Sequence, residues 1–533
     1  MKVESVNSTD IAGAIRLGCR TMSSVFNADD NDIPFFGSKV RPRARLSFSE
    51  RHSESHVPGR HLNGLLNAED AAGVVLDEEA VEKHTRAAFF SYSGTVALPL
   101  NRDRVGGDLV NFSAHNIREG FHALYALVKY RDSARAREVA EASIECVFKY
   151  WDPERGWKTE ELRRDHGLNV DEGQAFIVGL ARAIGPLVKY FRATRHGRAL
   201  ELAILLKDRA VDGWFAADGH YDADRFGTHT HSTTCVMSSI AQLADLTSDA
   251  SLMARTKAFY DNGLWAIRDE LGWVIENSCS DANPDRGEVN NTGDILETAL
   301  ILGRWGYADC YQDAERILRG HLLPSQLRDV SFIDSEPNPS GEDGLRDVAD
   351  RHLGAFGFPA PYGHQPVDAG DDAKYPGERV PVVSFNMDIV GGTVGSLCEA
   401  YRQSTRLDAT GHSVNLLFDH ETDAISVRSP YTHNALVITI KTPGPLRVRV
   451  PRWASHVSAV MSGTGKTGLA SGGYLFFADV PVGEELRIEF TLEPSEIVLR
   501  HRTRQIRVRM RGDTVEAMDN FGADLTFFDP LSG

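Results

Sequence analysis

Residues 290–323, NNTGDILETALILGRWGYADCYQDAERILRGHLL, contain one complete helical hairpin. The first half, 293–305, is apolar on most of its faces, which is typical of a helix that is covered all round. The second half, 311–323, places apolar residues at three-to-four spacing between charged ones, which is typical of a helix with one exposed face. The segment therefore predicts an inner helix followed by an outer helix.

This unit recurs along most of the chain. A short polar cluster precedes an apolar helical segment at 52–61, 113–120, 168–174, 228–234, 288–294 and 384–392. The successive steps are 59, 56, 60, 60 and 97 residues between the markers His56, His115, Asp171, His231, Asn291 and Asp388. Six hairpins are what a closed (α/α)6 toroid needs, and the long last step contains an insertion at about 327–383. The repeat therefore predicts a toroid in which the inner helices begin at one mouth.

The chain changes character near residue 410. Short runs rich in Val, Ile and aromatic residues follow, separated by Gly, Pro and Asp: AISVRSP, ALVITIKT, LRVRVPRWA, GYLFFADVP, ELRIEFTLEP and QIRVRMRGD. Such a series of short strands is typical of a β-sandwich. We therefore expect a mainly α plus β protein with two domains, an (α/α)6 toroid over 1–405 and a C-terminal β-sandwich over 406–533.

Composition narrows the class of protein. Of 533 residues, 42% are hydrophobic and 9% aromatic, which is ample for a large core and excludes a disordered chain. A net charge of −17 argues against nucleic acid or an anionic membrane as the main partner. No apolar run approaches the ~18 residues of a membrane span, and the six cysteines are scattered without a CxxC pair. We therefore expect a cytoplasmic protein.

The six clusters supply the candidate site residues, because inner-helix starts meet at one mouth and helix N-termini favour anionic or hydroxyl-bearing ligands. Asp388, Glu288 and Asp294 are the candidate catalytic carboxylates. The candidate substrate-binding residues are His56, Arg60, His115, Asp171, Glu172, His229, His231, Asn290 and Asn291. The pair His229-x-His231 has no third ligand at a recognisable spacing, so the sequence predicts neither a metal nor a cofactor.

Carboxylates, amides and imidazoles around a cavity are typical of sugar binding. Glycoside hydrolysis needs two carboxyl groups flanking the scissile bond, one of them kept protonated. We therefore expect a glycoside hydrolase acting on a small oligosaccharide, with Asp388 as nucleophile or base and Glu288 or Asp294 as acid.

The chain also resembles a known family. The strand LRVRVPRWA (446–454), the strand pair GGYLFFADVPVGEELRIEFTLEP (472–494) and the hairpin 290–323 are similar to glycoside hydrolase family 127, the β-L-arabinofuranosidases. The resemblance covers about 220–495 and implies a six-hairpin toroid, a β-sandwich and a sugar cavity.

The sequence departs from that family at the reactive positions. The family carries Glu-Thr-Cys before the fifth inner helix and a double cysteine before the sixth, which bind zinc and supply a thiolate nucleophile. The matching segments here read Asn290-Asn291-Thr292 and Asp388-Ile389-Val390. The resemblance thus implies the architecture without the zinc site, with Asp388 in the place of the nucleophilic cysteine.

Other functions stay open at this stage. A polysaccharide or oligosaccharide lyase would use His115, His229, His231 or Asn290 for proton abstraction and carboxylate neutralisation. Sugar epimerisation by a histidine pair and non-catalytic sugar binding are further alternatives. For the β-domain three roles are open: binding sugar, packing against the toroid, or mediating a homodimer.

Overall fold

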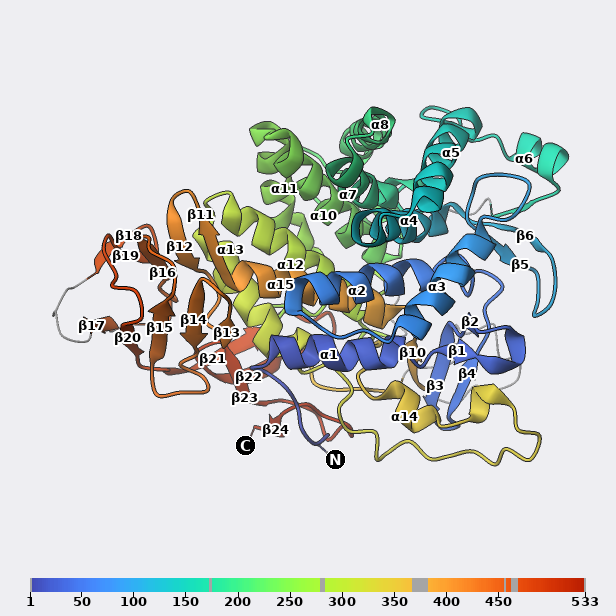
Figure 1. The fold of residues 1–533 in the computed structure, drawn as a ribbon. Helices are drawn as coiled ribbons and strands as arrows, with labels where there is room; N and C mark the ends of the chain where they lie inside the picture. The colour runs from blue at the N-terminus through green and yellow to red at the C-terminus, as the bar shows by residue number, and fades with distance from the viewer. Residues whose placement is uncertain are drawn as a thin grey trace.

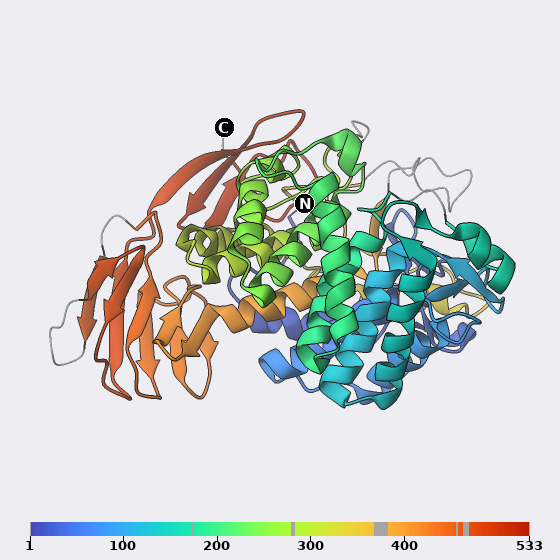
Figure 2. The same ribbon diagram turned by 90° about the horizontal axis from the view of Figure 1, so that it is seen from above.

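Six inner helices form a closed ring in the computed structural model (Figures 1 and 2). Residues 2–171, 175–278, 283–366, 382–454, 457–461 and 468–531 are described, with only the backbone at 458–461. Each inner helix packs on the next, and the last packs on the first. They are α2 (Val57–Ala72), α4 (Ile117–Arg131), α7 (Ile184–Thr194), α10 (Thr230–Thr247), α12 (Val289–Arg304) and α15 (Ile389–Ser404). The predicted toroid is confirmed.

Outer helices cover this ring. Five of them follow their inner helix directly, as predicted: α3 (Glu78–Ser91), α5 (Ala134–Tyr150), α8 (Gly197–Gly213), α11 (Ala250–Asp261) and α13 (Ala308–Ile317). The last inner helix runs straight into strand β11 instead, and its outer partner is the N-terminal helix α1 (Ile11–Met22), which packs on α15 and α2. The N-terminus therefore closes the ring.

Four of the outer helices begin differently from the inner helices, whereas the outer helices α8 and α13 also lack a side-chain cap bond. Asp10, Asp77, Ser133 and Asp249 each accept a backbone N–H bond at the start of outer helices α1, α3, α5 and α11, the usual role of these residue types. The residues that cap inner helices α2, α4, α10, α12 and α15 make no such bond. Their polar side chains are thus available to contact one another across the mouth of the ring.

Helices α2 and α4 pack very closely at Gly59. A Cβ atom added at this position would lie 1.9 Å from the backbone oxygen of Glu119, so only glycine fits unless the helices separate. The contact matters for the site because the adjacent Arg60 and the side chain of Glu119 form an ion pair.

We expect Gly59→Ala to lower the free energy of unfolding by about 3 kcal/mol or more, because the clash involves a helix backbone that cannot rotate away. Gly197→Ala in α8 is the matched control, since a Cβ there meets nothing within 4 Å. It should stay within about 1 kcal/mol of the parent protein. Urea unfolding of both variants measures the difference, and equal stabilities would contradict the close-packing argument.

One predicted inner helix begins later than expected. The segment 172–191 predicts a continuous helix, but α7 begins at Ile184 after a short 3₁₀ turn at Leu180–Ala183. Pro186 lies in the first turn of α7, where its missing N–H is tolerated, whereas proline within a continuous helix would remove a hydrogen bond. The proline therefore marks the start of this helix.

Two five-stranded sheets form the C-terminal β-sandwich. Their inner faces share one core that includes Val448, Phe477, Ile438 and Ile488. One sheet has the order β11-β12-β16-β19-β18, with only β12 and β16 parallel; the other is antiparallel throughout, in the order β13-β14-β15-β20-β17. In the first sheet the strands are Thr405–Asp408, Gly411–Val414, Leu446–Arg449, Tyr474–Phe477 and Leu469–Ser471. In the second they are His420–Glu421, Ile425–Arg428, Leu436–Ile440, Glu485–Phe490 and Val457–Met461.

A separate four-stranded sheet follows the sandwich. Its strands are β21 (Pro494–Leu499), β22 (Ile506–Arg511), β23 (Thr514–Met518) and β24 (Asp529–Pro530). Its apolar face shares a core with Leu271, Phe332 and Phe385, which belong to the helical part of the chain. The division into 1–405 and 406–533 stays a prediction.

Small elements complete the mouth of the ring. Short strands form the sheets β10-β3-β4, β5-β6-β9, β1-β2 and β7-β8. Their bounds are β1 (Phe26–Asn27), β2 (Ile33–Pro34), β3 (Gly37–Arg41), β4 (Arg45–Ser47), β5 (Leu100–Arg102), β6 (Leu109–Phe112), β7 (Trp151–Asp152), β8 (Gly156–Trp157), β9 (Asn169–Val170) and β10 (Val383–Asn386). Three short helices are α6 (Thr159–His166), α9 (Ala223–Phe226) and α14 (Val348–His352).

The sandwich packs against the toroid through buried polar contacts. Arg449 in β16 donates to Glu315 in α13 and to Gln312 Oε1 at 2.7 Å. Arg319 donates to Glu315 at 3.0 Å and to the backbone oxygen of Leu417 at 2.8 Å. Of the roles left open for the β-domain, packing against the toroid is therefore observed. Among the described helices, none is both long and apolar enough to cross a bilayer.

Candidate active site

Five imidazoles form a continuous row where the inner helices begin. Adjacent ring centroids are 5.2 Å apart for His52 and His56, 5.5 Å for His56 and His115, 5.4 Å for His115 and His229, and 5.8 Å for His229 and His231. We call these residues the histidine row. Burial lowers the pKa of His229 to about 3 and holds the pKa values of His115 and His231 well below the usual range, with nearby arginines acting in the same direction. These three rings are therefore neutral at neutral pH.

Asp388 lies beside the His56 side of the row. Its Oδ2 is 2.8 Å from Arg60 NH1 and 3.2 Å from His56 Nε2, and the residue is 3% exposed. Burial by itself raises the pKa of a carboxyl group, but Arg60 and His56 outweigh it and hold the pKa of Asp388 well below its usual range. Asp388 is thus a buried carboxylate that stays ionised.

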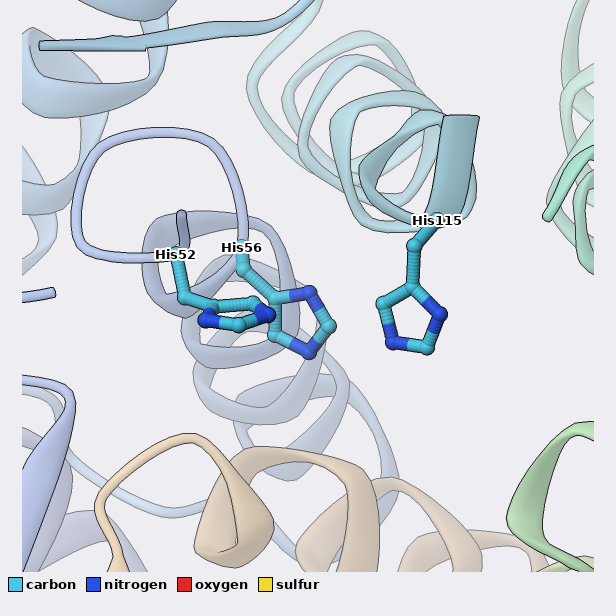
Figure 3. Close-up of side chains that lie close together, drawn as sticks. All are labelled: His52, His56 and His115. Carbon is cyan, nitrogen blue, oxygen red and sulfur yellow. The ribbon is translucent and has the colours of Figure 1, made fainter. Parts of the chain in front are cut away.

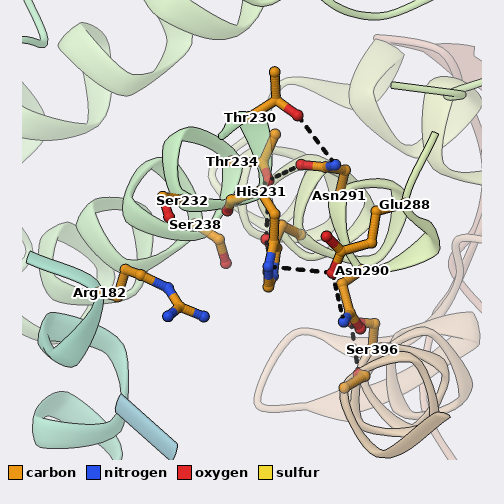
Figure 4. Close-up of polar contacts among 12 residues, drawn as sticks. Arg182, Thr230, His231, Ser232, Thr234, Ser238, Glu288, Asn290, Asn291 and Ser396 are labelled. Atoms are coloured by element: carbon orange, nitrogen blue, oxygen red, sulfur yellow. Dashed lines mark hydrogen bonds and ion pairs between the residues drawn. The ribbon is translucent and has the colours of Figure 1, made fainter. Parts of the chain in front are cut away.

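Glu288 lies beside the His231 side of the row (Figure 4). Its Oε1 is 3.3 Å from His231 Nδ1 and accepts a 3.0 Å hydrogen bond from Asn290 Nδ2, while Oε2 lies 4.0 Å from His229 Nε2. Burial raises the pKa of Glu288, and the negative charge of Asp388 raises it further, against the opposing effect of Arg60. The surroundings of Glu288 thus favour its protonated form, the opposite of the effect on Asp388.

Asp294 lies within helix α12, almost two turns beyond Glu288. Its Oδ2 accepts a 3.0 Å bond from Thr234 Oγ1 and lies 3.4 Å from His231 Nε2, and its Oδ1 lies 3.7 Å from Arg118 NH2. Burial raises its pKa from the ordinary 3.8 to about 7, although Arg118 acts in the opposite direction. His231 therefore lies between two carboxyl groups, Glu288 and Asp294.

The raised pKa of Asp294 predicts a pH-dependent stability. The folded state holds this proton more tightly than the unfolded state, so its contribution is complete below pH 3.8 and is lost as the pH rises through about 7. Asp294→Asn should therefore remove up to about 4 kcal/mol of the decline in unfolding free energy across this range. Urea unfolding at pH 4 and pH 8 measures the change. The exposed Asp218→Asn should retain the decline of the parent protein, and a parallel decline in Asp294→Asn would contradict the assignment.

Glu119 lies beneath the row and connects three arginines. Its Oε1 is 2.9 Å from Arg182 NH2, 3.1 Å from Arg118 NH1 and 3.4 Å from Arg60 Nε, and its side chain is fully buried. These arginines outweigh burial and hold the pKa of Glu119 well below its usual range. Sequence reasoning missed Glu119, Arg118 and Arg182. The four-residue step from His115 to Glu119 could have indicated the first, but nothing local indicates Arg182.

The remaining predicted residues occupy different places. Asn290 contacts Glu288, whereas Asn291 accepts a 2.8 Å bond from Thr234 Oγ1 and so ties α12 to α10. Asp171 lines a neighbouring pocket of about 330 Å³ together with Arg51, Asn101 and Asn169. Glu172 lies outside the described residues. The structure thus brings His56, Arg60, His115, His229, His231, Asn290 and the three candidate catalytic carboxylates into one network, and it places Asp171 beside it.

Cysteine ligands for zinc do not fit this site. The described cysteines are Cys19, Cys146, Cys235, Cys310 and Cys398, and none of them stands at the start of α12 or α15. Within the described part of the chain, two groups have ligand atoms within 4.8 Å of one another: His52 with His56 and His115, and His229 with His231 and Glu288. The prediction that the protein binds no metal stays a prediction.

Comparison with known proteins supports the fold. No protein-family model matches the sequence, and no curated protein matches it. A family 127 β-arabinofuranosidase structure is 13% identical with a TM-score of 0.59, over 94% of this chain and 79% of that one. The family 127 β-L-arabinofuranosidase Ara127N from Geobacillus stearothermophilus T6 is 12% identical with a TM-score of 0.55, over 95% and 80% of the two chains. A further glycoside hydrolase is 12% identical with a TM-score of 0.55, over 92% and 84%. The resemblance in the sequence is thus confirmed at the level of the fold, and this chain is similar in structure to family 127 β-arabinofuranosidases.

Proposed function

We propose that this protein is a glycoside hydrolase that acts on a small oligosaccharide at the histidine row. Asp388 serves as the nucleophile or base and Glu288 as the general acid. The solved structures to which the fold is similar are glycoside hydrolases, which supports the class of reaction.

The opposite pKa shifts of Asp388 and Glu288 carry this proposal. Two carboxyl groups that ionise very differently can act as base and acid at the same pH. Asp388 stands at the start of α15 and Glu288 at the start of α12, and these helices are neighbours in the ring. A glycoside bound at the mouth of the ring would therefore meet both groups, one accepting and one donating a proton.

Asp294 takes a different role in the proposal. Its Oδ2 accepts from Thr234 and lies 3.4 Å from His231 Nε2, so it orients the ring that contacts Glu288. We therefore assign the acid to Glu288 and treat Asp294 as a positioning residue. The neutral imidazole of His229 offers a hydrogen bond to a sugar hydroxyl group.

A panel of short oligosaccharides, including furanosides and uronic-acid sugars, tests the function. Hydrolysis releases a new reducing end without ultraviolet absorbance, which is the expected result. A product that absorbs because of a new double bond would replace the hydrolase with the lyase. A sugar that binds and is returned unchanged across the panel would favour a non-catalytic binding protein.

A further inference from the structure

Three members of the histidine row converge on one small space. His52 lies in the loop before α2, His56 directly precedes α2, and His115 lies in the 3₁₀ turn (Ala114–Asn116) before α4. One ring nitrogen of each lies within 4.8 Å of the other two. Figure 3 shows the three rings turned toward the space between them. Three imidazoles at such distances match the number of ligands in an open zinc site.

The other nitrogen of each ring is already engaged. His115 Nδ1 donates to the backbone oxygen of Val178 at 2.8 Å. His56 Nδ1 donates to Asn116 Oδ1 at 2.9 Å, and the amide orientation is set because Asn116 Nδ2 donates to the backbone oxygen of Arg51. His52 Nδ1 lies 3.1 Å from the hydroxyl of Ser49. Nδ1 contacts of this kind orient metal-ligating histidines and direct the Nε2 lone pair toward the ion.

Packing and charge add to this arrangement. Phe36 stacks on His52 with ring centroids 4.3 Å apart, and the His56 and His115 rings are parallel to within 5°. Asp388 Oδ2 lies 3.2 Å from His56 Nε2, and its buried Oδ1 has no hydrogen-bond partner among the described residues. A buried carboxylate beside three imidazoles supplies the negative charge that a divalent cation needs.

We propose that His52, His56 and His115 bind one divalent first-row metal ion of the zinc type through their Nε2 atoms. The fourth coordination position faces Asp388 or a water molecule. Imidazole is a preferred ligand of zinc, and the expected distances from metal to nitrogen are about 2.0–2.1 Å. The inference does not depend on the proposed hydrolase, because metal binding is measured without any sugar.

The neighbouring group of His229, His231 and Glu288 is the competing location. There His231 Nδ1 approaches Glu288 while its Nε2 approaches Asp294. His231 thus has a carboxyl group at each ring nitrogen, and His56 likewise lies between Asp388 at Nε2 and Glu119, 3.6 Å from Nδ1. His52 and His115 differ, because their Nδ1 atoms contact a hydroxyl group and a backbone oxygen. This difference favours the first group and makes His231 the matched control.

Isothermal titration of the full-length, chelator-treated protein with zinc chloride tests the inference. We expect one equivalent to bind to the wild type, and His115→Ala to weaken binding by about 100-fold or more. His231→Ala and the exposed His433→Ala should bind like the wild type. Absence of binding to the wild type, or loss of binding in His231→Ala with retention in His115→Ala, would overturn the assignment.

A measurement on the unaltered protein guards against a variant that fails to fold. Crystals soaked in zinc should give one anomalous-scattering peak at bonding distance from the Nε2 atoms of His52, His56 and His115. A peak at Glu288 instead, or no peak, would contradict the site. Hydrolysis by a metal-free preparation would leave the proposed function intact, since the two are tested separately.

Discussion

Asp388→Asn should reduce kcat by about 10³-fold or more on a true substrate, because an amide can neither attack the sugar nor accept a proton. The substitution retains the size of the side chain but removes the charge that Arg60 and His56 face. We therefore also expect a loss of about 3 kcal/mol in unfolding free energy, the usual cost of leaving a buried ion pair without one partner. Initial rates and urea unfolding measure the two effects.

Asp313→Asn is the matched control for this loss of stability. Asp313 in α13 also pairs with a buried arginine, with bonds of 2.8 and 3.0 Å from Arg268, but it lies in the outer ring. This variant should lose comparable stability and retain activity. If Asp388→Asn hydrolyses substrate at the rate of the parent protein, Asp388 is neither nucleophile nor base. If Asp313→Asn loses activity to the same extent, the loss of activity in Asp388→Asn comes from impaired folding and not from chemistry.

The activity that Glu288→Gln retains should depend on the leaving group of the substrate. Natural oligosaccharides need a proton on the departing oxygen, so we expect kcat/KM to fall by about 10²–10⁴-fold. Aryl glycosides with an acidic phenol need no such proton, and the variant should retain most of its activity on them. Asp388→Asn should lose both activities, because the attack itself requires its carboxylate. The different rates of the two variants on aryl glycosides would thus assign the acid role to Glu288 and the nucleophile or base role to Asp388.

The pH profile adds an independent measurement for Glu288. The group acts in its protonated form and its pKa is raised, so kcat/KM of the wild type should decline as the pH rises through that pKa. On the acid side activity should persist below the usual carboxyl range, because the pKa of Asp388 is held low. Glu288→Gln should lose the alkaline decline on aryl glycosides. Retention of that decline in Glu288→Gln, with its loss in Asp294→Asn, would transfer the acid role to Asp294.

The helical ring could be predicted because it is encoded in local spacing. Helices such as α12 and α13 repeat apolar residues every three to four positions, and the near-60-residue step places each hairpin in the same phase. The closure of the ring by α1 was not predictable, because this helix precedes the first repeat and packs on α15, which is almost 400 residues further along. In the sequence, only Pro186 indicated that α7 begins late.

The candidate site was predictable as a set of positions. Polar residues at inner-helix starts pointed to His56, His115, His229, Glu288 and Asp388, and the structure brings these together. Arg182 was missed because it lies in a 3₁₀ turn among apolar residues and reaches the site only in space, through Glu119 and the backbone oxygen of His115. The group of His52, His56 and His115 could not be recognised as a ligand set either, since 59 residues separate His56 from His115.

The sequence by itself determined the number of hairpins, the change from helices to strands, and which helix starts carry polar side chains. These properties depend on periodicity and residue type, which are visible along the chain. Only the tertiary structure decided which carboxyl pKa is raised and which is lowered. Asp388 and Glu288 are both buried acids, but Asp388 meets Arg60 and His56 from the far end of the chain, whereas Glu288 meets neutral imidazoles and an amide. A pKa depends on burial and on the nearest charges in space, and neither follows from the order of residues.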